Sequence, residues 1–229
     1  MKLGNLGKFI FQLLRSLTSI DKKHLLPIPL LVFLNGLAIV ALGSLSIYAK
    51  IKNKGAGIEN LFSDPFNRST FYLGWFTGIS EILWSTAIAV CLFTTFLLPP
   101  ANRKVKGFFL VSSLLMALLY FDDRFRLTLI LVVFFGAYTK VKAIVYSIYG
   151  SLLILYGWKF RQIIKKTLYL PLILSFLLFA LSSVVDITPM TSRGAHAMLE
   201  DGTKLIGLIN LTLYFWYACY TEVKQYLRN

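Results

Sequence analysis

Long apolar runs alternate with short polar segments along the chain. About 20 residues of α-helix are needed to cross a hydrocarbon core of roughly 30 Å, and most of these runs approach or exceed that length. The pattern therefore predicts an all-α, polytopic membrane helix bundle with about six transmembrane helices. We expect them at residues 25–49, 70–98, 107–121, 143–158 and 168–185, and from residue 194 past residue 217.

One apolar segment is too short for a full crossing. Residues 127–138 are apolar but cover only about half of the length that a spanning helix needs, and Lys140 and Lys142 follow them. We therefore expect a short re-entrant or interfacial helix here, with both of its ends on the same side of the membrane.

The amino-terminal segment has a different periodicity. Within residues 3–20, apolar residues recur at steps of three and four, and Lys8 and Arg15 fall off that stripe. This pattern is typical of an amphipathic helix that lies on the membrane surface. We therefore divide the chain into an interfacial segment, residues 1–24, and a transmembrane domain, residues 25–229.

Composition supports the membrane interpretation. Hydrophobic residues make up 57% of the chain and charged residues only 15%, which is unusually little charge for a soluble domain. The net charge of +14 would suggest nucleic acid in a soluble protein. Here Lys and Arg lie between the apolar runs, so we expect contacts with the lipid bilayer and anionic lipid headgroups, and none with nucleic acid.

The basic residues also predict an orientation. With six crossings, both termini lie on one side, and that side receives more of the 24 Lys and Arg residues than the other. The positive-inside rule then places the termini in the cytoplasm. We expect a multi-pass protein of the plasma (inner) membrane.

The acidic residues gather on the opposite side in this topology. Glu59 and Asp64 fall there, as do the acids that end two predicted helices and begin the last one. Glu81 lies inside a predicted helix, near mid-membrane, with Ser85 one turn away. An ionisable group inside a span costs several kcal/mol unless it is paired, protonated or wetted, so Glu81 is a functional candidate.

These groups form the candidate site. We expect most of them to meet in one outward-opening cavity that binds an ion or ligand; the alternative is that they serve as helix ends, stop signals and interhelical ties. No catalytic role or metal ligand is assigned, and no cofactor is identified. The candidates are Glu81, Ser85, Asp122, Asp123, Asp186, His196, Glu200 and Asp201.

Three classes of function fit such a cavity. The first is a cation- or proton-coupled transporter or channel, because carboxylates at membrane depth bind and release protons or ions. The second is an intramembrane metal-dependent hydrolase or lipid-modifying enzyme. The third is a non-catalytic membrane subunit or assembly factor, with a protein partner or a second copy of the chain. The sequence contains no nucleotide-binding, serine-hydrolase or zinc-protease motif that would choose among them.

Ser, Asp and His residues near one membrane face loosely resemble the ceramidase-like hydrolase superfamily. That resemblance implies a zinc site built from a set of histidines. The chain has only His24 and His196, which we expect on opposite sides of the membrane, so no site of that superfamily is transferred to it.

Overall fold

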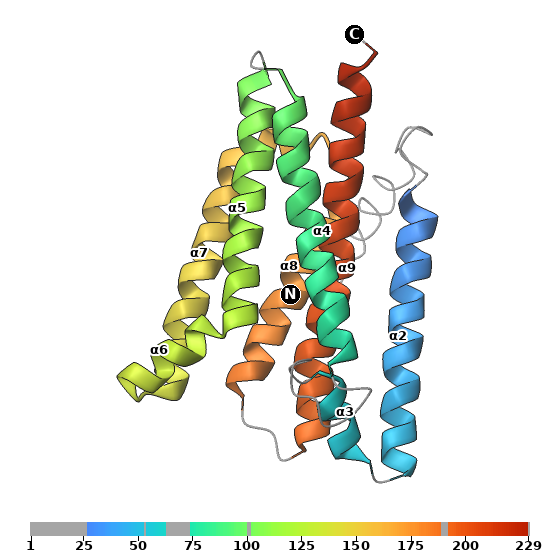
Figure 1. Ribbon diagram of the computed structural model, residues 1–229, viewed down its shortest axis with the longest axis vertical. Helices are drawn as coiled ribbons and strands as arrows, with labels where there is room; N and C mark the ends of the chain where they lie inside the picture. The colour runs from blue at the N-terminus through green and yellow to red at the C-terminus, as the bar shows by residue number, and fades with distance from the viewer. Residues whose placement is uncertain (1–26, 53, 63–73, 100–101, 189–191, 229) are drawn as a thin grey trace, which may run out of the picture.

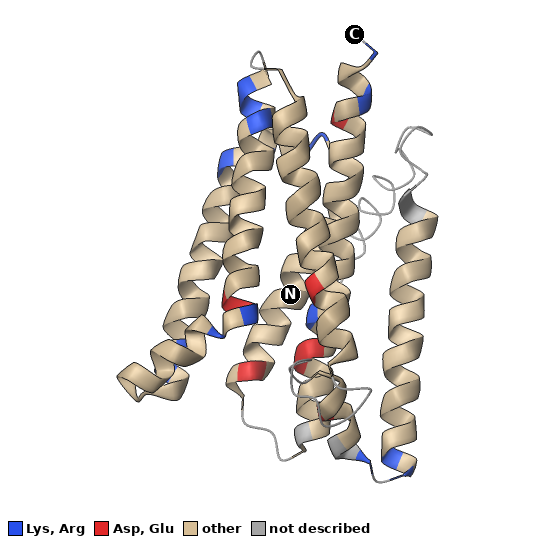
Figure 2. Cartoon of the chain, in the orientation of Figure 1, with Lys and Arg blue, Asp and Glu red and all other residues tan. Residues whose placement is uncertain are grey.

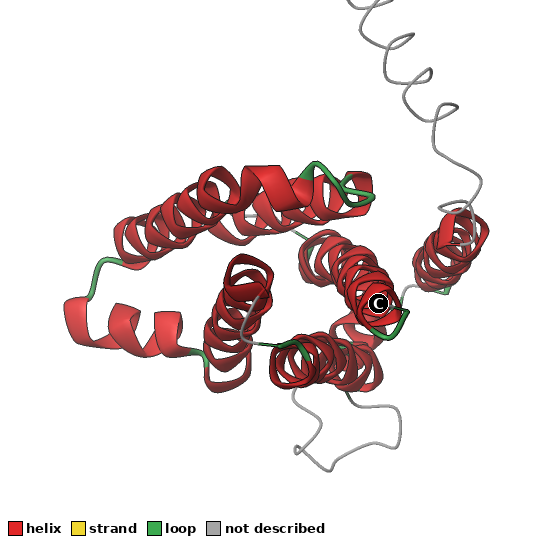
Figure 3. Ribbon diagram, turned by 90° about the horizontal axis from the view of Figure 1, so that it is seen from above, coloured by secondary structure: helices red, strands yellow, loops and turns green. Residues whose placement is uncertain are grey.

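The computed structural model describes residues 27–52, 54–62, 74–99, 102–188 and 192–228, and the described part is helical throughout (Figures 1 and 3). The helices are α2 (Pro27–Ile51), α3 (Gly55–Leu61), α4 (Trp75–Leu97), α5 (Arg103–Phe125), α6 (Leu127–Phe135), α7 (Tyr138–Ile164), α8 (Leu170–Ile187) and α9 (Arg193–Tyr226). The predicted interfacial helix within residues 1–24 lies outside the described residues, so it and the two-part division remain predictions.

The long helices form a membrane bundle, as the apolar runs predicted. Five of them, α2, α4, α5, α7 and α8, are long and apolar enough to cross a membrane. α9 is the sixth long helix and runs beside them through the middle of the bundle (Figure 1). The chain is therefore a polytopic, all-helical membrane protein.

α9 packs against four of the other described helices. It contacts α8, α4, α2 and α3 along its length, and Leu208 and Phe215 on it are almost fully buried. α9 can be less apolar than its neighbours because its faces meet protein rather than lipid. The stretch 214–217, which resembles an interfacial aromatic belt in sequence, lies partly in this core: Tyr214 is 3% exposed, and Trp216 is 56% exposed.

Several helices are longer than the apolar runs suggested. α5 begins at Arg103 rather than near residue 107, and α7 begins at Tyr138 rather than at residue 143, so that it includes Lys140 and Lys142. Long basic side chains can lie along a helix with their charged ends at an interface, so a charge near the end of an apolar run does not end a helix. The predicted loop after α2 also contains the short helix α3.

α6 is a short helix at the end of the bundle where α5 ends and α7 begins (Figure 1). α5 and α7 run antiparallel on either side of it, so α6 does not cross, as its length predicted. Its ends are defined by two residues with positive φ: Arg126 at 50° and Gly136 at 70°. The amide of Gly136 closes the last turn on the carbonyl of Val132.

Charge is distributed unequally between the two ends of the bundle (Figure 2). Most described Asp and Glu residues lie in the half that contains α6, together with a similar number of Lys and Arg residues. At the end where α5 begins and α7 and α9 end, Lys and Arg predominate because few acids lie there. We call these the acidic end and the basic end. The side of the membrane that each faces remains a prediction.

Candidate functional site

A polar cavity of about 350 Å³ lies at the acidic end. α4, α5, α6, α7, α8 and α9 all contribute to its wall. We call it the charged cavity, because acidic and basic side chains alternate around it. Its charged residues are Glu81, Asp122, Asp123, Arg124, Arg126, Lys142, Asp186, Glu200, Asp201 and Lys204.

The most buried charge pair joins α7 to α8. The ammonium of Lys142 donates to both carboxylate oxygens of Asp186 at 2.7 Å, and the Tyr146 hydroxyl donates to the same carboxylate at 2.5 Å. Lys142 also donates to the Tyr138 hydroxyl at 2.7 Å. The side chains of Lys142 and Asp186 are only 9% and 12% exposed, so each depends on the other for compensation of its charge.

Lys204 on α9 lies between two carboxylates. Its ammonium contacts Asp123 of α5 at 2.5 Å and Asp201, one turn away on α9, at 3.5 Å. The contact with Asp201 is the longer one, so Asp123 is the principal partner. A lysine shared in this way ties α5 to α9 and leaves Asp201 only partly compensated.

Two further acids hold local structure. Glu81 of α4 pairs with Arg124 of α5, with 3.2 Å between Oε1 and Nε. Asp122 accepts hydrogen bonds from the amide and hydroxyl of Thr128, at 2.7 and 2.8 Å. Thr128 lies in the first turn of α6, so Asp122 satisfies an amide that the helix itself leaves without an acceptor.

His196 and Glu200 form a contact that requires a proton. Nε2 of His196 lies 3.0 Å from the carbonyl oxygen of Val185, which can only accept, so Nε2 carries a hydrogen. Nδ1 lies 3.3 Å from Oε2 of Glu200. Two bare acceptors would repel each other at this distance, so an additional proton belongs either to Nδ1 or to the carboxyl group.

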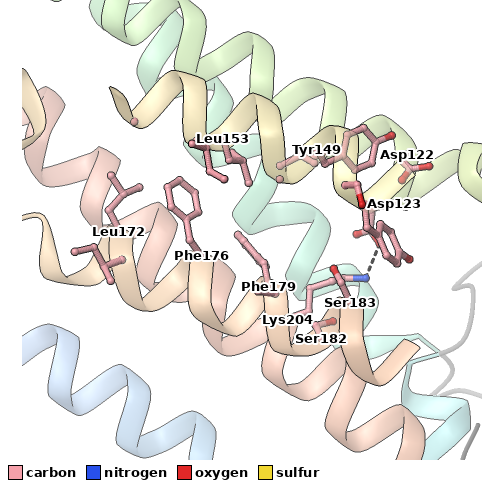
Figure 4. A pocket seen from close by; sticks show the side chains of 18 of the residues that line it. Asp122, Asp123, Tyr149, Leu153, Leu172, Phe176, Phe179, Ser182, Ser183 and Lys204 are labelled. Carbon is pink, nitrogen blue, oxygen red and sulfur yellow. Dashed lines mark hydrogen bonds and ion pairs between the residues drawn. The ribbon is translucent and has the colours of Figure 1, made fainter. Parts of the chain in front are cut away.

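A second, larger cavity adjoins the charged cavity. It measures about 1100 Å³, lies between α7 and α8, and is lined mainly by apolar side chains such as Leu153, Phe176 and Phe179 (Figure 4). We call it the apolar cavity. The two cavities are adjacent, because six residues line both: Asp122, Asp123, Tyr146, Asp186, Glu200 and Lys204.

One buried donor in the apolar cavity is unsatisfied. Trp84 of α4 is 3% exposed and stacks on Phe179, with 5.8 Å between ring centroids. Its indole N–H has no hydrogen-bond partner among the residues that the structure describes. Buried N–H groups usually have a partner, so this donor is available to a bound molecule.

A third space lies on the far side of the charged cavity. It measures about 510 Å³ and is bounded by Glu59, Thr139, Thr188 and His196. Asp186 and Glu200 line all three spaces and therefore lie at their junction.

The comparison with known protein families gives a match that covers most of the chain. Residues 30–218 match the sequence profile of a family described as a domain of unknown function (DUF8692). The chain belongs to this family. The matched segment contains every residue of the three cavities. No curated protein and no solved structure matches the chain.

The structure brings most of the predicted site residues together. Seven of the eight candidates line at least one of the three spaces, and Ser85 is the exception, because it is exposed and faces away from them. Their binding role stays a prediction. The acids lie together because they occur near helix ends, and the topology brings these helix ends to the same end of the bundle.

The sequence interpretation did not find the basic and aromatic partners. Lys142 was expected only to follow an apolar run, Lys204 was considered only as an i,i+4 partner of Glu200, and Tyr146 received no role. One signal was available: Lys142 and Tyr146 are four residues apart and share a helix face. Their common partner Asp186 is on another helix, which spacing does not reveal.

No metal centre is evident in the part of the chain that the structure describes. Within those residues, no three His, Cys, Asp or Glu side chains lie close enough together to ligate one ion. His24, the other histidine, lies outside the described residues.

Proposed function

We propose that this protein is a proton-coupled transporter whose cargo is an amphiphilic cation. The observation that carries the proposal is that the charged and apolar cavities adjoin and share six lining residues. A molecule with an apolar body can therefore bind in the apolar cavity beside the carboxyl groups of the charged cavity, which can exchange protons.

The His196–Glu200 contact supports the coupling step. It holds a proton at the junction of the three spaces, where one of them leads toward the end of the bundle. A cation that approaches Glu200 favours the ionised carboxylate, so cargo binding releases the proton, and proton binding releases the cargo. This exchange is the thermodynamic basis of coupling.

The charges that line the apolar cavity support a cationic cargo. At its junction with the charged cavity, its wall contains Asp122, Asp123, Asp186 and Glu200 but only one cation, Lys204. Asp122 and Glu200 are held by a hydroxyl and an imidazole rather than by Lys or Arg. A positive group bound here meets the carboxylate of Asp122, which Thr128 rather than a cation holds, and it can replace the proton of the His196–Glu200 contact. Its apolar body contacts Leu153 and Phe176.

Uptake of tetraphenylphosphonium into liposomes tests this proposal. The full chain is reconstituted, a pH gradient is imposed, and uptake is compared for wild type and Glu200→Gln. We expect wild type to accumulate the probe in response to the gradient, and Glu200→Gln to reduce the gradient-driven component about tenfold or more. Gln keeps the shape and hydrogen-bonding capacity of the side chain, but it does not titrate.

Ser85→Ala is the matched control, because Ser85 lies on an exposed face of α4 away from the cavities; its uptake should equal that of wild type. Uptake by wild type that does not exceed that of protein-free liposomes would contradict the proposal. So would gradient-driven uptake that persists in Glu200→Gln.

A further inference from the structure

Two cations lie at the other end of the apolar cavity. Arg161 and Lys165 are one turn apart at the end of α7 and both line this cavity. Both are exposed, and neither side chain has an ion-pair or hydrogen-bond partner within the described chain. They differ in this respect from Lys142 and Lys204, whose charges carboxylates compensate.

The apolar part of the cavity wall between Gly150 and Arg161 fits a lipid chain. Arg161 follows Gly150 by eleven positions on α7, which at 1.5 Å per residue separates them by about 16 Å. That length is about half of a hydrocarbon core of roughly 30 Å, so it matches the chain region of one leaflet. Between them lie Leu153, Ile154 and Gly157, and α8 contributes Leu172 and Phe176.

Two features of the structure give an acyl chain space in the apolar cavity and a way into it from the bilayer. A Cβ built on Gly150 or Gly157 would meet no atom within 4 Å. α8 packs along α9 but makes little direct contact with α7, so the cavity lies between two helices that are not tightly packed together. Ile154 and Ile173 in its wall are 73% and 46% exposed, so the same surface faces lipid.

We propose that the apolar cavity binds one anionic phospholipid, with its phosphate at Arg161 and Lys165 and an acyl chain along α7 past Gly157. Charge complementarity selects an anionic headgroup, because these two cations have no carboxylate beside them. The amino-terminal end of α8 adds a favourable dipole and the carboxyl-terminal end of α7 an unfavourable one, so the two side-chain charges dominate. This proposal does not rest on the proposed transport, because it is argued from Arg161, Lys165 and the cavity wall alone. The acyl chain would contact Leu153 and Phe176, which the proposed cargo also contacts, so lipid and cargo would compete for the apolar cavity.

Native mass spectrometry of the full chain in detergent, titrated with phosphatidylglycerol or phosphatidylcholine, tests the proposal. We expect wild type to bind one phosphatidylglycerol, and to bind it more tightly than phosphatidylcholine. The double variant Arg161→Gln/Lys165→Gln should bind phosphatidylglycerol about tenfold or more weakly. Lys104→Gln/Lys159→Gln is the matched control: it removes two exposed charges from the same end, and neither residue lines the cavity.

A second variant tests whether the acyl chain of the lipid lies along α7. Gly157→Leu leaves both cations in place and fills the space beside α7, so it should also lose the lipid; Gly36→Leu adds the same side chain at an open glycine on α2 and should not. Thermal unfolding shows whether each variant is folded. Three results would overturn the proposal: wild-type affinity in the double variant, equal loss in the charge control, or equal binding of the two lipids. Retention by Gly157→Leu together with displacement of the lipid by inorganic phosphate would reduce the site to a surface anion site and would also overturn it.

Discussion

Asp186 shows how one side chain holds several helices together at the acidic end. It accepts hydrogen bonds from Lys142 and Tyr146 of α7 and lies at the junction of the three spaces. Its burial makes the pair costly to break, because the remaining charge would stay in an environment of low polarity. The pairing of Lys142 is also exclusive, since no other described carboxylate contacts this residue.

Removal of Asp186 alone should therefore cost more than removal of the whole pair. Asp186→Ala should lower the free energy of unfolding by about 3 kcal/mol, because Lys142 is left buried without a counter-charge. Lys142→Met/Asp186→Ala should recover most of that loss. Denaturant unfolding in detergent, followed by tryptophan fluorescence, measures both. A double variant no more stable than the single variant would show that the charge of Lys142 is not the cause.

Single residues also show where sequence reasoning ends. Glu81 was identified correctly as an acid within a span, because its position in an apolar run is visible in the sequence. Its partner Arg124 directly follows Asp122 and Asp123 in the sequence, yet it pairs with Glu81 of α4. Which helices are neighbours decides such pairs, and hydropathy does not encode the order of helices around a bundle.

Helices were easier to predict than their ends. Long apolar runs predict spanning helices because unsatisfied backbone groups are so costly in lipid. The ends depend on capping contacts, such as the hydrogen bond from the Thr128 amide to Asp122 and the positive φ of Arg126, which the surrounding helices stabilise. The short helix α3 was missed because its seven residues include two glycines and have no apolar stripe.

α6 gives a prediction at the scale of an element. If it lies at one end of the bundle, cysteines placed at Arg126 and Lys140 should react with an impermeant thiol reagent from the same side, since both positions are exposed and flank the short helix. Labelling in sealed vesicles from either side measures this. Reaction from opposite sides would make α6 a crossing and would reverse α7, α8 and α9 relative to α5.

At the scale of the whole molecule, the two ends differ mainly in their acidic residues, and the orientation of the bundle remains a prediction. Applied to all 24 Lys and Arg residues, the positive-inside rule predicts the basic end in the cytoplasm and the acidic end outside. The proposed lipid site would then face the inner leaflet, where anionic lipids attract cationic side chains. The proposed proton site would face the outside.

Accessible cysteines test that orientation. In intact cells, cysteines at Lys52 and Thr188 should react with an impermeant reagent, whereas cysteines at Lys104 and Lys165 should react only after the membrane is opened. The native thiols do not interfere, because Cys91 and Cys219 are both buried. Labelling of Lys165→Cys in intact cells would invert the topology.

The central position of α9 bears on how the protein is made. Of the described helices, α9 leaves the ribosome last, yet α2, which emerges first, is joined to it by paired amides of Asn35 and Asn210. Until synthesis reaches Asn210, the earlier helices sit in the bilayer with their inward faces uncovered. A chain that stops before this residue is therefore expected to remain unassembled and to be recognised by membrane proteases, even though most of its spans are already inserted.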